Sequence, residues 1–388
     1  MTLRKLSDTI AQLARMKAPG GLGSAFPAAD RLHDLEGFGT DPGNLRARLH
    51  VPERLDDRPA LVVVLHGCTQ SAAGYDAGSG WSRLADEQGF IVLFPEQRRA
   101  NNPNLCFNWF SPGDTRRDGG EALSIREMVA HVVSRHAIDP ARIFVTGLSA
   151  GGAMTAVMLA TYPEIFAGGA IIAGLPYGIA TSVPEALDRM RGHGGPVNAQ
   201  LGDLVRRAST HRGPWPTISI WHGTGDVTVA ASNAEATLEQ WRSLHGVGPA
   251  PSAVEQVDGQ KRRVWRDEAG RAVIEDYSIA GLGHGTPLSA SGEDALGTAG
   301  PFMLEAGISS TRHIAAFWGL TATVEAASPR AKDAAADPEQ RASATQPGLP
   351  AIRSATRVVE PPAVKAQAQA SGVGKVIEDA LRAAGLMR

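Results

Sequence analysis

The feature that most restricts the fold of this chain is a repeated alternation of short apolar runs with amphipathic segments. Several of the apolar runs show no polar alternation, which is typical of strands that are buried on both faces. Between them, segments such as EALSIREMVAHVVSRHAI place Ile125, Val129 and Val132 on one helical stripe. Buried strands that alternate with helices predict an α/β fold with a mostly parallel central sheet and helices on both faces. The predicted strands are LRARLHV, ALVVVLHG, FIVLFPE, RIFVTG, GGAIIAG, TISIWHG and AVIEDYSI.

The length of 388 residues and the changes in composition along the chain suggest one large domain with extensions at both ends. We expect the domain to cover residues 41–322, after an N-terminal helix and linker over residues 1–40. The later sequence is rich in Ala, Pro, Ser and Gln, which predicts a disordered linker over 323–371 and an amphipathic helix over 372–388. Residues 178–213, between two core strands, are either a small cap over the sheet's C-terminal edge or a crossover helix with long loops.

The stretch TGLSAGG places a serine where a predicted strand meets a predicted helix. Ser149 follows the strand RIFVTG, and the helix after it is stopped by Pro163. A G-x-S-x-G sequence in this position makes a tight turn that needs small neighbours, here Gly147 and Gly151, with Gly152 as an additional one. The turn projects the serine above the sheet, and the N-terminus of the helix favours negative charge there. We therefore identify Ser149 as a candidate nucleophile and not as one more serine of a glycine-rich connection.

A serine hydroxyl needs a base that takes its proton and an acid that orients the base. In a sheet of this kind the acid and then the histidine follow the serine, each just beyond a strand. Asp226 follows the strand TISIWHG on a Gly-rich turn, and His284 follows the strand AVIEDYSI in another Gly-rich loop. We expect Ser149, Asp226 and His284 to form a catalytic triad. The competing acids are Asp203, Asp258 and Asp276, which lie in polar segments or within a strand pattern.

Acyl transfer also needs two N–H donors aimed at the oxyanion that forms on the substrate. We expect one donor to be the N–H of Ala150, directly after the nucleophile. The second should come from the loop after the early buried strand, where the run VVVLHGCTQ offers the N–H of Cys68 or of Thr69. His66, in the same loop, is expected to be a structural hydrogen-bonding residue and not a base.

The composition argues against several kinds of partner. A formal net charge of -2 gives no electrostatic reason to expect nucleic acid, and no apolar run approaches the roughly 20 residues that span a bilayer. The start MTLRKLSDTIAQLARMKAPGG spaces its apolar residues helically and does not read as a signal peptide. We therefore expect a cytoplasmic location, with secretion by another route still open. Cys68 and Cys106 are too few for a disulfide framework or a zinc site, and they are either free thiols or paired with each other.

Five ordered motifs together resemble the esterase family of poly(3-hydroxybutyrate) depolymerases, which are α/β-hydrolases related to feruloyl and acetylxylan esterases. The similarity covers roughly residues 40 to 320. It implies an α/β-hydrolase fold and serine esterase activity through Ser149, Asp226 and His284, with an oxyanion donor at Cys68. The motifs are LHGCTQ with NNPNLCFNWF downstream, IDPARIFVTGLSAGGAM, AGLPYG, WHGTGDVTV and GLGHGTP.

The resemblance also bears on the cysteines, the substrate and the cofactor. The motifs HGC and CFNWF flank the same pocket in relatives, which implies that Cys68 and Cys106 lie close together and can form a disulfide. Trp109, Phe110 and Tyr177 are candidates to line an apolar substrate site. The only small-molecule partner implied is an ester, and the reaction requires no metal ion and no organic cofactor.

Three hypotheses of function remain at this point. The first is a serine esterase that acts on poly(3-hydroxybutyrate) or its oligomers, and the second is a carbohydrate esterase of the feruloyl or acetylxylan type. The third is a granule-associated interaction protein with an idle hydrolase core, whose terminal helices mediate self-association or granule contact. Secreted depolymerases carry a signal peptide and often a separate polymer-binding domain, and neither is seen in this sequence. We therefore expect oligomers, native granules or another ester as the substrate.

Overall fold

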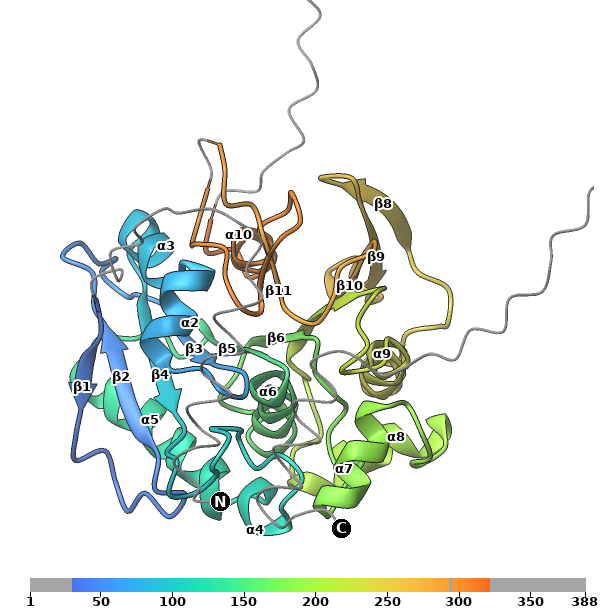
Figure 1. Cartoon of the computed structure of the whole chain (residues 1–388), viewed down its shortest axis with the longest axis horizontal. Helices are drawn as coiled ribbons and strands as arrows, with labels where there is room; N and C mark the ends of the chain where they lie inside the picture. Colours follow the sequence, from blue (N-terminus) through green and yellow to red (C-terminus); the bar gives the residue numbers. More distant parts are fainter. Residues whose placement is uncertain (1–29, 293–294, 322–388) are drawn as a thin grey trace, which may run out of the picture.

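The computed structural model describes residues 30–292 and 295–321. The predicted linker over 323–371 and the predicted terminal helices lie outside the described residues. Within the described ranges, twelve strands form a large sheet and a small two-stranded sheet (Figure 1). The strands are β1 (His33–Leu35), β2 (Arg46–His50), β3 (Leu61–Leu65), β4 (Ile91–Glu96), β5 (Ile143–Leu148), β6 (Gly168–Ile172), β7 (Thr217–Gly223), β8 (Ala253–Val257), β9 (Gln260–Arg266), β10 (Ala272–Ile279), β11 (Thr286–Leu288) and β12 (Met303–Glu305).

The large sheet is parallel in its centre and antiparallel at both edges. Its strand order is β1-β2-β4-β3-β5-β6-β7-β10-β9-β8. Neighbours from β4 through β10 pair in parallel, whereas β1, β2, β9 and β8 pair with their neighbours antiparallel. The predicted mostly parallel sheet is therefore confirmed. The carboxyl ends of the parallel strands lie at one edge, where the loops after β3, β5, β7 and β10 can meet.

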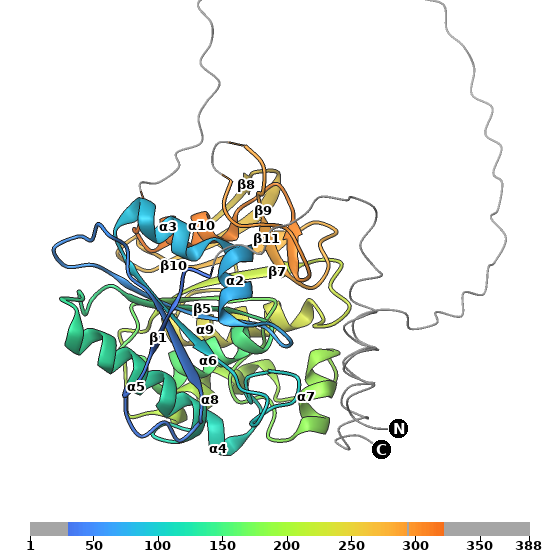
Figure 2. The same cartoon turned by 60° about the vertical axis from the view of Figure 1, so that its left-hand side comes forward.

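Helices cover both faces of the sheet, as the alternating pattern predicts. In Figure 2, α2, α3 and α10 lie on one side of the strands and α5, α6, α8 and α9 on the other. The described helices are α2 (Ala72–Ser79), α3 (Trp81–Gln88), α4 (Pro112–Thr115), α5 (Gly120–Arg135), α6 (Ala150–Thr161), α7 (Val183–Met190), α8 (Asn198–Ala208), α9 (Ser232–His245) and α10 (Ser310–Phe317). No helix in residues 30–292 or 295–321 is long and apolar enough to cross a membrane.

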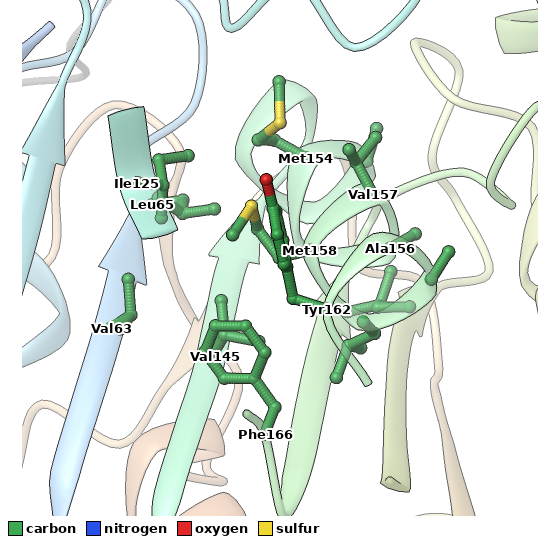
Figure 3. Packing of buried hydrophobic residues seen from close by; sticks show 14 of the residues in the cluster. Val63, Leu65, Ile125, Val145, Met154, Ala156, Val157, Met158, Tyr162 and Phe166 are labelled. Atoms are coloured by element: carbon green, nitrogen blue, oxygen red, sulfur yellow. The ribbon is translucent and has the colours of Figure 1, made fainter. Parts of the chain in front are cut away.

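Side chains that alternate along the central strands supply one core on each face. In β3, Leu61, Val63 and Leu65 belong to the core under α5 and α6, and Val62 and Val64 belong to the core under α2, α3 and α10. All residues of α6 are buried, and each fully buried aliphatic side chain contributes about 1.5–3 kcal/mol. This packing fixes the N-terminus of α6 over the end of β5. In Figure 3, Met158 of α6 points toward Leu65 and Ile125, whereas Val157 lies on the opposite side of the helix.

The insertion at 178–213 forms α7 and α8, which are built into the helical layer beside α9. The side chain of Gln240 in α9 accepts the Tyr177 N–H at 2.9 Å and donates to the Leu201 carbonyl at 3.0 Å. Asn233 donates to the carbonyl of Arg189 at 2.9 Å. These bonds tie both helices of the insertion to α9. A role of the insertion as a cap over the site stays a prediction.

The edge strands β1 and β8, and β9 between β8 and β10, are absent from the sequence prediction. β1 lies within residues 1–40, which the sequence assigns to a helix and linker. β8 is mostly exposed, and β9 begins QKRR, so neither has the apolar pattern of a core strand. Instead, Arg262 and Arg263 of β9 pair at 2.8 Å with the buried carboxylates of Glu275 and Asp276 in β10. Charged side chains are common on edge strands such as β8, and the ion pairs of β9 replace an apolar alternation. The hydrophobic pattern therefore misses both strands.

Candidate active site

Ser149 lies on the turn between β5 and α6, at the carboxyl edge of the parallel strands. Its backbone has φ 57° and ψ -116°, a conformation that costs a non-glycine residue on the order of 1–3 kcal/mol. The neighbouring glycines permit the close approach, because a Cβ on Gly147 would lie 2.5 Å from the backbone of Gly151. The N–H of Ser149 donates to the carbonyl of Ile172 in β6 at 2.9 Å. Packing against the adjacent strands thus holds the strained turn in place.

Replacing Gly151 with alanine is expected to lower the free energy of unfolding by about 1–3 kcal/mol, the usual cost of overpacking. The new methyl group would overlap the backbone carbonyl oxygens of Leu65 and His66, which cannot move without displacing β3 and its loop. Urea unfolding monitored by circular dichroism measures the change. Gly248→Ala is the matched control, because a Cβ there meets no atom within 4 Å. Equal stability of Gly151→Ala and the wild type would contradict this account of the turn.

Side chains from three loops meet at Ser149. The Nε2 atom of His284 lies 2.8 Å from Ser149 Oγ, and its Nδ1 atom lies 2.7 Å from Asp226 Oδ2. The parallel pairing of β7 with β10 makes the loops of Asp226 and His284 leave the sheet at the same edge as the Ser149 turn. The side chains of Asp226 and His284 are 0% and 6% exposed, respectively. The structure therefore joins the three residues selected from the sequence in one row of hydrogen bonds.

The surroundings of Asp226 favour its ionised form. Its Oδ1 atom accepts the N–H groups of Thr228 at 2.8 Å and Val229 at 2.9 Å. Burial would raise the pKa of Asp226, but the hydrogen bond from His284, the charge of that imidazole and the Val229 N–H together hold it below its ordinary value. An ionised carboxylate keeps the proton of His284 on Nδ1, which leaves Nε2 free to accept a proton from Ser149.

A second histidine, absent from the sequence prediction, lies against the same carboxylate. The Nε2 atom of His222 is 2.9 Å from the Val229 carbonyl and 3.5 Å from Asp226 Oδ2. Burial lowers the pKa of His222, so the ring is neutral and donates its Nε2–H to the carbonyl. The sequence feature that could have indicated this contact is the position of His222 at the end of β7, four residues before Asp226.

The three competing acids all have partners away from Ser149. Each forms a hydrogen bond or ion pair with a basic side chain on its own or a neighbouring element. The pairs are Asp203 with Arg206 at 2.9 Å, Asp258 with His313 at 2.8 Å, and Asp276 with Arg263 at 2.8 Å. The geometry therefore favours Asp226.

The loop after β3 offers a free N–H donor. The Thr69 N–H donates to the Asn104 carbonyl at 2.7 Å, so it is already occupied. For the N–H groups of Cys68 and Ala150, no acceptor is found within residues 30–292 and 295–321. This contrast favours Cys68 over Thr69 as the donor of this loop.

His66 has the structural role expected of it. Its Nδ1 atom is 2.8 Å from the Gly67 carbonyl, and its Nε2 atom accepts the Gln97 N–H at 3.1 Å. Burial lowers the pKa of His66. Both ring nitrogens are therefore used by the backbone, and the neutral ring fixes the turn that leads to Cys68.

Cys68 and Cys106 form a disulfide, the pairing that the resemblance implies. Trp109, which is 8% exposed, and Phe110 follow Cys106 closely in the chain. Their rings pack edge to face, with 5.6 Å between the ring centroids. Tyr177 is half-buried and packs against the same core as both rings. The role of these three aromatic residues toward a substrate stays a prediction.

A strained serine turn at the carboxyl edge of a mostly parallel sheet, with an acid and a histidine on later loops, defines an α/β-hydrolase. The family model described as Esterase PHB depolymerase matches residues 47–263, which is more than half of the chain. The chain belongs to this family, and it is a carboxylic ester hydrolase.

Relatives with curated functions include depolymerases and carbohydrate esterases. The chain is 47% identical to poly(3-hydroxyalkanoate) depolymerase C of Paucimonas lemoignei over 291 residues, which cover 74% of this chain and 70% of the relative. It is 33% identical to an acetylxylan esterase of Coprinopsis cinerea over 268 residues, which cover 67% of this chain and 71% of the relative. Among solved structures, the acetyl xylan esterase from Aspergillus awamori superposes with a TM-score of 0.64 at 25% identity, over 75% of this chain and 99% of that protein.

Proposed function

We propose that the protein is a serine esterase that hydrolyses poly(3-hydroxyalkanoate) chains or their oligomers. In this proposal Ser149 is the nucleophile, His284 is the base, and Asp226 is the carboxylate that orients the base. The observation that carries the proposal is the continuous row from Ser149 Oγ to His284 at 2.8 Å and from His284 to Asp226 at 2.7 Å. The strained turn under the serine supports the same assignment, because strain of this kind clusters at functional sites.

In the proposed acylation step, His284 Nε2 takes the proton of Ser149 as Oγ attacks the ester carbonyl carbon. The ionised Asp226 stabilises the imidazolium that results. The carbonyl oxygen becomes an oxyanion and accepts the N–H groups of Ala150 and Cys68, which act most strongly when charge develops. Collapse of the tetrahedral intermediate breaks the bond to the alcohol, and the alcohol leaves with the proton from His284.

In the proposed deacylation step, water replaces the alcohol. His284 takes a proton from the water, which attacks the acyl carbonyl carbon, and the same two N–H groups hold the second oxyanion. Ser149 leaves with the proton from His284, and the free acid is released. Every proton transfer is thus assigned to one imidazole.

The choice of a polyester over other esters rests on the relatives and on the aromatic residues. The identity to the depolymerase is 47%, against 33% for the acetylxylan esterase. Trp109 and Phe110 follow the disulfide that is joined to the donor loop, and their rings would suit an apolar 3-hydroxyacyl unit. A carbohydrate esterase is the second candidate, and the superposition on the acetyl xylan esterase favours it.

A fluorophosphonate reagent and a substrate panel test the proposal. The reagent is expected to label Ser149, as shown by peptide mapping, because the activated hydroxyl attacks phosphorus as it attacks a carbonyl. In the panel, kcat/KM is expected to be highest for 3-hydroxybutyrate oligomers, compared with acetylated xylan, methyl ferulate and p-nitrophenyl acetate. Higher kcat/KM on acetylated xylan or methyl ferulate would support the carbohydrate esterase. If Ser149 is not labelled, the result would instead support the hypothesis of an interaction protein with an idle hydrolase core.

A further inference from the structure

The donor loop that carries Cys68 is attached to a second loop, residues 97–110. The two are joined by the Cys68–Cys106 disulfide and by the hydrogen bond from the Thr69 N–H to the Asn104 carbonyl at 2.7 Å. A residue beside each cysteine has a left-handed backbone, with φ 65° at Thr69 and φ 55° at Leu105. Such conformations are costly for these residues and persist only where the surroundings impose them. The position of the Cys68 N–H therefore depends on how loop 97–110 is held.

The buried carboxyl group of Glu121 is hydrogen-bonded to both ends of loop 97–110. Glu121, in the first turn of α5, is 1% exposed. Its Oε1 atom accepts the side-chain amides of Gln97 at 2.6 Å and Asn108 at 2.7 Å, and its Oε2 atom accepts the Asn108 N–H at 2.8 Å. All three partners are amide donors, so the site is shaped for an acceptor. A buried donor left unpaired costs about 1–3 kcal/mol, so these amides depend on Glu121 as their acceptor.

Two short paths run from this carboxylate to the donor loop. On the first, the Gln97 side chain bonds to Glu121, and its own N–H donates to His66 Nε2 at 3.1 Å, directly before the Gly67–Cys68 turn. The second path leads to Cys106. Asn108, two residues after Cys106, bonds to Glu121, and the Gln97 side chain, which also bonds to Glu121, donates to the Cys106 carbonyl at 3.1 Å. The first path ends on His66, two residues before Cys68, and the second ends on Cys106, which is bonded to Cys68.

Burial raises the pKa of the Glu121 carboxyl to about 8, with a further contribution from the charge of Asp114, against the hydrogen bonds from Gln97 and Asn108 that lower it. A carboxyl group in such a dry position is costly to ionise, and acidic residues are rarely buried this completely. The proposed mechanism assigns it no proton transfer. A positioning role would account for a costly group next to the donor loop.

We propose that Glu121 is a positioning residue for the oxyanion site, which holds the Cys68 N–H in place through Gln97, Asn108 and the Cys68–Cys106 disulfide. The inference rests on the proposed function, because it assumes that the Cys68 N–H binds the oxyanion. Glu121 itself contacts neither Ser149 nor His284 by any hydrogen bond found among the described residues. Its influence on the reaction would therefore act through the Cys68 N–H, which meets the oxyanion in the transition state.

The test is Glu121→Gln, compared with the wild type on p-nitrophenyl butyrate. Glutamine keeps the shape, but its NH2 group faces one of the amide donors, so one hydrogen bond is lost. We expect kcat to fall at least about tenfold, since small displacements of catalytic groups have large effects, while KM changes less than twofold. Phenylboronic acid, which forms a tetrahedral adduct with an active serine, is expected to bind more weakly by a similar factor.

Glu127→Gln is the matched control. Glu127 lies in the same helix and also holds a loop by its carboxylate, with Thr40 Oγ1 and the Asp41 N–H both at 2.8 Å. That loop meets loop 97–110 at Arg98 and Asn101, but among the described residues it forms no hydrogen bond with Glu121, His66 or Cys106. We therefore expect kcat and boronate binding to stay within twofold of the wild type. Should Glu121→Gln fail to fold, Asn108→Ala replaces it, because this variant removes only one side-chain bond to Glu121 and leaves the carboxylate in place.

The outcomes separate this inference from the proposed function. If the wild type hydrolyses the ester and its Ser149 is labelled, but the folded Glu121 variant keeps its kcat and boronate affinity, the positioning role is rejected. A loss of melting temperature with unchanged kcat rejects it too, because the role would then be structural only. If the wild type itself neither reacts nor is labelled, the proposed function fails first.

Discussion

Replacing Ser149 with alanine is expected to reduce kcat for ester hydrolysis by at least about 10⁴-fold, the scale of loss when a nucleophile of this kind is removed. Alanine keeps the backbone of the turn but removes Oγ, so no acyl-enzyme can form and only water held near the N–H donors remains. The stability of the fold is expected to change little, because Ser149 Oγ bonds only to His284 among the described side chains. Initial rates with a 3-hydroxybutyrate oligomer and a thermal melt measure both effects.

Ser134→Ala is the matched control for Ser149→Ala. The Ser134 hydroxyl donates to the His131 carbonyl at 2.7 Å near the end of α5, and the side chain is exposed. Its removal is expected to leave kcat within twofold of the wild type. Ester hydrolysis at the wild-type rate by Ser149→Ala would falsify the assignment of the nucleophile.

The three residues of the row could be selected from the sequence because each stands next to a locally recognisable strand. Ser149, Asp226 and His284 follow β5, β7 and β10, and all three strands carry buried apolar residues. Parallel strands in one sheet share a carboxyl edge, so the order along the chain was enough to expect the residues together. The sequence favoured Asp226 over Asp203, Asp258 and Asp276, and the geometry agrees, because of these four only Asp226 bonds to His284.

The supporting residues could not be selected in this way, because their roles depend on contacts far along the chain. Glu121 bonds to Gln97, which is 24 residues away, and the Cys106 loop is joined to Cys68 across 38 residues. In the sequence, Glu121 looks like an ordinary acidic residue at the start of a helix. The strand β9 was missed because Arg262 and Arg263 pair with acids in β10 and give it no apolar pattern.

The cytoplasmic location stays a prediction, and it bears on whether the Cys68–Cys106 disulfide persists. Disulfides persist mainly in oxidising compartments and are rare in the cytosol. If Cys68 and Cys106 are reduced there, the donor loop keeps only the hydrogen bond from Thr69 to Asn104 and the network on Glu121. These hydrogen bonds would then carry the positioning that the covalent bond otherwise shares. The location of the protein and the importance of Glu121 are therefore linked.

Replacing Asp226 with asparagine is expected to reduce kcat by about 10⁴-fold, the scale of the effect when the acid of such a triad becomes an amide. The amide has one acceptor and one donor end, and the structure determines which end faces the imidazole. At the Oδ1 position two N–H groups converge, from Thr228 at 2.8 Å and from Val229 at 2.9 Å. The amide oxygen must stay there, so the NH2 group faces His284 Nδ1. The imidazole proton then moves to Nε2, which can no longer accept a proton from Ser149.

The control for Asp226→Asn is Asp258→Asn, because Asp258 also forms an aspartate–histidine pair, with His313 Nε2 at 2.8 Å. This pair is partly exposed and distant in the hydrogen-bond network from Ser149, so kcat is expected to stay within twofold of the wild type. The pH profile of kcat sharpens the test. A tautomer effect persists wherever the imidazole is neutral, so the loss in Asp226→Asn should remain at high pH. Recovery of the wild-type kcat at any pH would show that Asp226 only adjusts the charge of His284 and does not select its tautomer.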